Sequence, residues 1–93
     1  MKVLATCGNG MGSSLLMEMK VKQVLNRQGI SFEIEHCSVG EAVSIAGNFD
    51  LIFCPRAFAD SFAGVREKVK VIPLQNVLSE EEIEEKCREN QIF

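Results

Sequence analysis

The chain has 93 residues, of which 46% are hydrophobic and 25% are charged, and its formal net charge is -3. This length fits a single domain over residues 1–93 and excludes a separate substrate domain, and the composition excludes a disordered segment. The lysines and arginines are scattered along the chain, which excludes the basic stripe of a nucleic-acid-binding protein.

The first third of the chain predicts a strand, a glycine-rich loop and a helix. Lys2–Thr6 is a short apolar run typical of a buried strand, and the glycines of residues 8–12 end it. Gly29 lies where a helix commonly ends in a left-handed residue. Between them, apolar residues recur with the spacing of one buried helix face at Met17, Val21, Val24 and Leu25.

The middle third predicts a strand, a short helix and a second strand. Ser31–His36 alternates apolar and acidic residues, which favours an edge strand with one solvated face. Residues 38–41 have the pattern of a capping box, so a short helix is expected after Ser38. Leu51–Cys54 is a continuous apolar run ended by Pro55, as in a central parallel strand.

The last third predicts a weaker strand over Val69–Leu74, preceded by a helix over Asp60–Glu67. Ser79 and Glu82 form a second capping-box pattern, which predicts a final helix that runs to about Asn90.

Strands that alternate with helices indicate an α/β fold, in which helices cover both faces of a parallel sheet. We expect four strands in the flavodoxin-like order 2-1-3-4. This order places a topological switch point between the first and third strands, where the loop after Thr6 lies beside the loop after Cys54.

The apolar run at residues 3–7 is too short to span a bilayer, and no signal-peptide core follows it. We therefore expect a cytoplasmic protein that does not insert into the membrane. The chain has four cysteines: Cys7, Cys37, Cys54 and Cys87. They are expected to remain reduced, and no two have the C-x2-4-C spacing of a zinc site, so no metal site is predicted.

A cysteine opens the glycine-rich loop. A loop of this kind between a strand and a helix directs backbone N–H groups into a concavity that suits phosphate. The nucleotide-binding patterns G-x-G-x-x-G and Gly-Lys-Ser/Thr are absent. The same N–H groups stabilise a thiolate, so we expect Cys7 to ionise readily and to attack phosphorus without a metal or organic cofactor.

The predicted phosphate-binding residues form the loop after Cys7: Gly8, Asn9, Gly10, Met11, Gly12, Ser13 and Ser14. The alternative is that Cys7 fills the end of a buried strand and that the glycines form only a tight turn. Arg56, just after the third strand, is a candidate phosphate contact, and a solvated loop arginine is the alternative there.

The spacing Cys7-x5-Ser13-Ser14 resembles the Cys-x5-Arg-Ser/Thr loop of low-molecular-weight tyrosine phosphatases, with serine in place of arginine. In that family the arginine clamps the phosphoryl oxygens in the transition state, so its absence disfavours rapid hydrolysis. A carrier must keep its phosphoryl group from water. The pattern therefore favours phosphotransfer over a phosphatase or arsenate-reductase-like enzyme, which stays an alternative together with a non-catalytic binding domain.

Residues 7–14, with Met19-Lys20-Val21 and Cys37-Ser38-Val39-Gly40-Glu41, resemble the ascorbate-type IIB components of bacterial sugar phosphotransferase systems, within the lactose/cellobiose-like superfamily. The resemblance covers nearly the whole chain in length and element order. It implies a phosphotransferase in which Cys7 accepts phosphate from a phosphohistidine of a IIA component. The acceptor would be a sugar, ascorbate by the same similarity, bound in the membrane IIC component.

A second apolar row, Met11, Leu15 and Met19, lies on the side of the first helix opposite its buried face. It predicts either an adaptable docking strip for IIA and IIC or a surface covered by the final helix.

Overall fold

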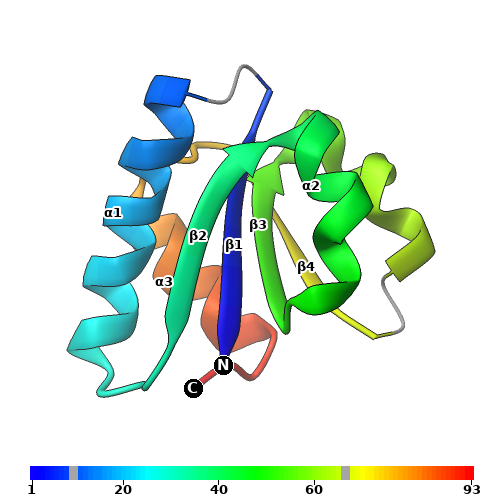
Figure 1. Cartoon of the computed structure of the whole chain (residues 1–93). Coiled ribbons are helices and arrows are strands. Elements are labelled where there is room, and N and C mark those ends of the chain that lie inside the picture. Colours follow the sequence, from blue (N-terminus) through cyan, green and yellow to red (C-terminus); the bar gives the residue numbers. More distant parts are fainter. Residues whose placement is uncertain (9–10, 66–67) are drawn as a thin grey trace.

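The computed structural model has four parallel strands in one sheet, in the order β2-β1-β3-β4 (Figure 1). It describes residues 1–8, 11–65 and 68–93, with the backbone alone for residues 11–13. The strands are β1 (Lys2–Cys7), β2 (Glu33–Ser38), β3 (Leu51–Pro55) and β4 (Lys70–Leu74). The α/β fold and the strand order expected from the sequence are thus confirmed.

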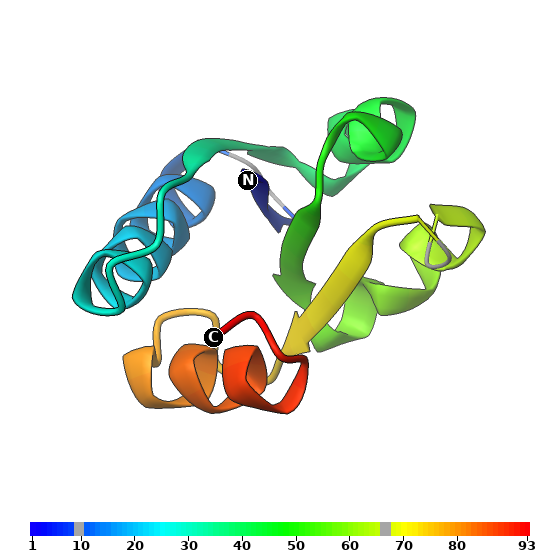
Figure 2. The same ribbon diagram turned by 90° about the horizontal axis from the view of Figure 1, so that it is seen from below.

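Helices cover both faces of the sheet, as Figure 2 shows from below. Helices α1 (Met11–Arg27) and α3 (Glu80–Glu89) pack on one face. Helix α2 (Val39–Ile45), the short 3-10 helix η1 (Ala46–Asn48) and the longer 3-10 helix η2 (Arg56–Val65) lie on the other.

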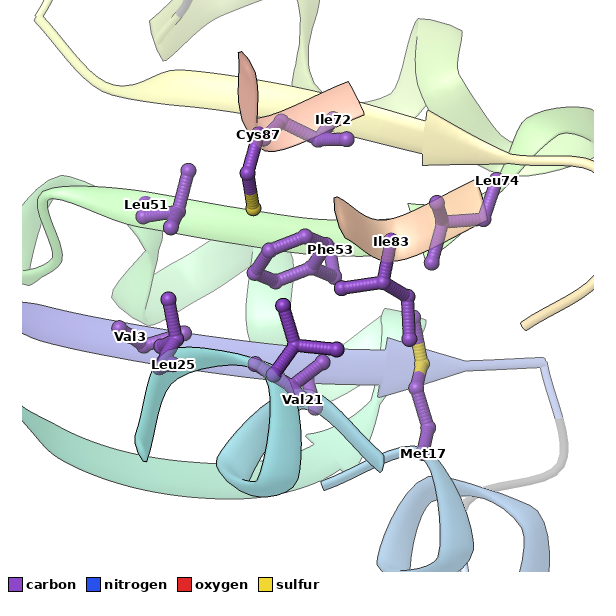
Figure 3. Close-up of a cluster of buried hydrophobic side chains, with 12 residues drawn as sticks. Val3, Met17, Val21, Leu25, Leu51, Phe53, Ile72, Leu74, Ile83 and Cys87 are labelled. Carbon is purple, nitrogen blue, oxygen red and sulfur yellow. The ribbon is translucent and has the colours of Figure 1, made fainter. Parts of the chain in front are cut away.

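Two apolar cores result, because successive strand residues point to opposite faces of the sheet. On the α1–α3 face, Phe53 of β3 lies between Val21 of α1 and Ile83 of α3 (Figure 3). On the other face, Leu4 and Ile52 pack with Phe62 of η2. The central strands β1 and β3 therefore carry apolar residues on both faces, which is why they read as continuous apolar runs.

Helix α1 buries the face that its spacing predicts. Met17, Val21, Val24 and Leu25 are all 0% exposed. Gly29, with φ +70°, follows the helix in the left-handed conformation expected there.

The second apolar row of α1 faces solvent. Leu15 is 44% exposed and Met19 is 48% exposed, so α3 does not cover them. The side chain of Met11, the third member of the row, lies outside the described residues.

Helix α3 is joined to α1 by polar contacts at the surface. A carboxylate oxygen of Glu80 lies 2.6 Å from Arg27 Nη1, and the other lies 3.4 Å from Lys20 Nζ. The hydrogen bond from Arg27 lowers the pKa of Glu80. Such exposed pairs add little stability each, and burial of the apolar face holds α3 in place.

Two predicted elements are placed differently. The second strand is Glu33–Ser38 rather than Ser31–His36, because pairing with β1 runs from Lys2 opposite Glu33 to Cys7 opposite Ser38. The helix expected over 60–67 is a 3-10 helix that begins earlier, directly after Pro55, and ends at Val65. Residues 66 and 67 lie outside the described residues. Within the described ranges, no helix is long and apolar enough to cross a bilayer.

Candidate functional site

The two central strands separate at their carboxyl ends. Strand β1 pairs with β3 only from Val3 to Ala5, although it pairs with β2 as far as Cys7. Just beyond Ala5, the buried Thr6 hydroxyl donates to the Phe53 carbonyl at 3.0 Å, which adds a hydrogen bond between the two strands. An opening follows at the switch point that the strand order predicted.

Cys7 lies in a cavity of about 650 Å³ at this opening. The described residues that line it come from four segments: Cys7, Gly8, Pro55, Phe58, Gln75, Asn76, Val77 and Leu78. Cys7 is only 5% exposed, so a reacting group reaches its thiol from the cavity.

The first glycine of the loop is in close contact with an aromatic ring. A Cβ placed on Gly8 would lie 2.9 Å from both Cε2 and Cζ of Phe58, which is closer than atoms in contact can approach. The φ of Gly8 is not in the left-handed region. Glycine is therefore favoured at this position for space rather than for backbone conformation, because any larger residue requires the Phe58 ring to move.

The predicted phosphate-binding loop is described in part. Asn9 and Gly10 lie outside the described residues, as do the side chains of Met11 and Ser13; the backbone of residues 11–13 begins α1. Ser14 lies in the first turn of α1 and is fully buried. The assignment of these residues to phosphate binding stays a prediction.

Glu82 holds one wall of the Cys7 cavity. The capping box expected here is half correct, because the Ser79 hydroxyl accepts the Glu82 N–H at 3.2 Å. The Glu82 carboxylate, however, accepts the backbone N–H groups of Gln75 and Asn76 at 2.6 and 2.7 Å. Sequence reasoning missed this contact, because the Ser-x-x-Glu pattern indicates only a helix start.

The other three cysteines are less suited to nucleophilic chemistry. Cys54 and Cys87 are fully buried. Burial, reinforced by nearby glutamates, raises the pKa of the Cys37 thiol, and burial with Glu84 raises that of Cys87 to about 11. Protonated thiols are poor nucleophiles. None of the four cysteines, all of them within the described residues, forms a disulfide.

Arg56 lies at the same edge of the sheet as Cys7, as the strand order predicted, but does not line its cavity. It lines a second cavity of about 300 Å³ with Pro73, Gln75, Glu82 and Lys86. Gln75 borders both cavities. Contact between Arg56 and a phosphoryl group stays a prediction.

The family model described as "PTS system, Lactose/Cellobiose specific IIB subunit" matches residues 2–89. The chain belongs to this family. Similar proteins include the ascorbate-specific PTS system EIIB components of Salmonella typhimurium and Shigella flexneri. Each is 37% identical over 78 residues, which cover 84% of this chain and 76% of the relative.

The solved lactose-specific IIB domain of Streptococcus pneumoniae has the same fold as this IIB chain. The two superpose with a TM-score of 0.71 and 18% identity, over 99% of this chain and 95% of that domain. IIB proteins are phosphotransferases of the sugar phosphotransferase system and work with IIA and IIC components. Family membership therefore favours a phosphoryl carrier over the hydrolase alternative.

Proposed function

We propose that this IIB protein carries a phosphoryl group on Cys7, which it receives from a phosphohistidine of a IIA component and passes to a sugar held by a membrane IIC component. The observation that carries the assignment is the position of Cys7. Cys7 lines a cavity at the switch point and directly precedes the loop that leads into α1. We propose ascorbate as the sugar, because relatives at 37% identity are named for it.

In the first step, the Cys7 thiolate attacks the phosphorus atom of the phosphohistidine. An S–P bond forms while the P–N bond breaks, and the imidazole nitrogen of the donor keeps the electron pair. In the second step, a sugar hydroxyl attacks the same phosphorus. An O–P bond forms, sulfur leaves as the thiolate, and the hydroxyl proton passes to a base or to solvent.

Both steps need a thiol that leaves as readily as it attacks. Amides at the start of α1, together with the helix dipole, would stabilise the sulfur anion in both roles. The apolar side chains of Phe58 and Leu78 beside Cys7 limit the approach of water to the phosphocysteine. The protein would act as one domain in the cytoplasm, where the donor is formed.

The test replaces Cys7 by serine, which keeps the shape but has a hydroxyl that stays protonated at neutral pH. Wild type and Cys7→Ser are mixed with phosphoenolpyruvate, the general phosphotransferase components and an ascorbate-type IIA protein. Mass spectrometry then locates the phosphoryl group.

We expect phosphate on Cys7 in the wild type and none in a folded Cys7→Ser protein. Cys37→Ser is the matched control and should be phosphorylated at the wild-type rate. Phosphorylation of Cys7→Ser at the wild-type rate would refute the proposal. Continuous release of inorganic phosphate by the wild type would instead favour the hydrolase.

A further inference from the structure

The Cys7 cavity has an exposed apolar rim. Phe58 is 37% exposed and Leu78 is 41% exposed, and both line the cavity with the half-buried Val77. We call these three residues the apolar rim. Large side chains that remain in water next to a reactive group, when other apolar residues are fully buried, commonly mark a binding surface.

Helix α1 also carries an exposed apolar side chain toward the edge of the sheet that holds Cys7. Lys20 and Glu80 lie side by side where α1 meets α3. Leu16 is one turn before Lys20 on α1, and Leu78 is two residues before Glu80. Both therefore lie nearer than the Lys20–Glu80 pair to the edge of the sheet that carries Cys7. Leu16 is 47% exposed. A further exposed apolar side chain thus lies toward the same edge of the sheet as the rim.

Two cations lie at a cavity next to that of Cys7. Arg56 and Lys86 line the second cavity, which Gln75 separates from the first. The carboxylate in that cavity, Glu82, already accepts two backbone N–H groups.

Among the described residues, these two cations have few acidic partners. Lys86 has a distant contact with Glu89, at 3.8 Å. No acidic side chain of the described residues pairs with Arg56. On a chain with a net charge of -3, two cations thus face an open cavity beside the reactive one.

We propose that the apolar rim and the Arg56–Lys86 cavity together form the docking surface for the phosphoryl-donor protein. The donor presents an apolar surface around its phosphohistidine, which covers the rim, and a carboxylate that enters between Arg56 and Lys86. Apolar contact excludes water from the transferring group, and the charge pair sets the orientation and speeds the encounter. This inference rests on the function proposed above and identifies the surface that the donor contacts.

The test compares two docking variants with two matched controls. Leu78→Gln removes an apolar contact of the rim, and Arg56→Glu reverses one charge of the cavity. Ile45→Gln changes an apolar residue that is 37% exposed, close to the 41% of Leu78, but that lies at the end of α2. Lys68→Glu reverses a charge just before β4, at the edge of the sheet opposite Cys7.

Initial rates of Cys7 phosphorylation are measured against the concentration of a phosphorylated ascorbate-type IIA protein, at low and at high salt. Leu78→Gln should raise KM roughly fivefold, as expected for the loss of a central apolar contact. Arg56→Glu should raise KM roughly tenfold and weaken its dependence on salt. In both variants we expect the rise in KM to exceed any change in kcat and Tm to stay unchanged, and we expect both controls to match wild type.

Each of the other possible outcomes overturns either the proposed function or the proposed docking surface. If wild type accepts no phosphate, the proposed function fails before docking is examined. If wild type is phosphorylated and both docking variants keep its KM, the function stands and the docking surface is wrong. If Arg56→Glu lowers kcat and leaves KM unchanged, Arg56 acts on the phosphoryl group itself. Arg56→Gln and Leu78→Ser replace any variant whose Tm falls.

Discussion

The contact between Gly8 and Phe58 makes Gly8→Ala a sharp test of the site. The new Cβ would lie 2.9 Å from two ring carbons, whereas carbon atoms in contact prefer roughly 3.5–4.0 Å. The ring must therefore move by several tenths of an ångström or swing into solvent. Because Phe58 is already 37% exposed, the ring has room to move outward.

Two opposing effects set the size of the change. Overpacking of this kind costs about 1–3 kcal/mol, and the outer position of the ring favours the lower part of that range. Alanine also restricts the unfolded chain, which stabilises the fold by about 0.4–1 kcal/mol at a φ that alanine can adopt. We expect Gly8→Ala to lower the free energy of unfolding by about 1 kcal/mol.

The assay is a double-mutant cycle followed by urea unfolding of wild type, Gly8→Ala, Phe58→Ala and the double variant. With the ring removed, Gly8→Ala should be neutral or slightly stabilising, because only the effect on the unfolded chain remains. The coupling energy should be about 1–2 kcal/mol. Additive effects within about 0.3 kcal/mol would show that the ring does not set the requirement for glycine.

Two further predictions concern α3. Glu82→Gln should lower the free energy of unfolding by about 1–2 kcal/mol and slow phosphotransfer, because the carboxylate no longer holds residues 75–76 through charged hydrogen bonds. The same change at the exposed neighbour Glu81 should do neither. An unchanged transfer rate in a less stable Glu82→Gln would contradict the positioning role. The raised pKa of Cys87 means that, as pH rises, the thiol loses its proton in the unfolded chain before it does so in the folded protein. The free energy of unfolding should therefore fall by up to about 1.4 kcal/mol per pH unit as pH rises from 9.0 to about 11. Denaturation curves of Cys87→Ala over that range should lack this component, and an identical slope in both proteins would refute the assignment.

The order of the strands was predictable because the apolar runs differ in kind. Continuous runs mark β1 and β3 as central, and alternation marks β2 as an edge. The ends of β2 were wrong by two residues because alternation gives the phase of a strand and not its limits. Its pairing with β1 sets those limits, by a contact between segments far apart in the chain.

The nucleophile of the site could be predicted from the sequence, but the residues that form the walls of its cavity could not. Cys7 was found because a cysteine between a strand and a glycine-rich loop has a specific chemical meaning. The wall at residues 75–78 gave no such signal, since it approaches Cys7 only through the fold and through Glu82. Likewise, Phe58 belongs to a 3-10 helix whose start was placed too late, so its contact with Gly8 could not be anticipated.

The separation of Cys7 from the wall along the chain has a consequence for synthesis. The nucleophile precedes three of the four strands along the chain, whereas Glu82, which fastens the opposite wall, follows after all four. Domains fold as the ribosome delivers them, so a nascent or prematurely terminated chain exposes the Cys7 thiol without its enclosure. Such chains would be open to oxidation and to coupling with other thiols until α3 is in place. The order of translation thus makes the reactive cysteine most vulnerable before the protein can use it.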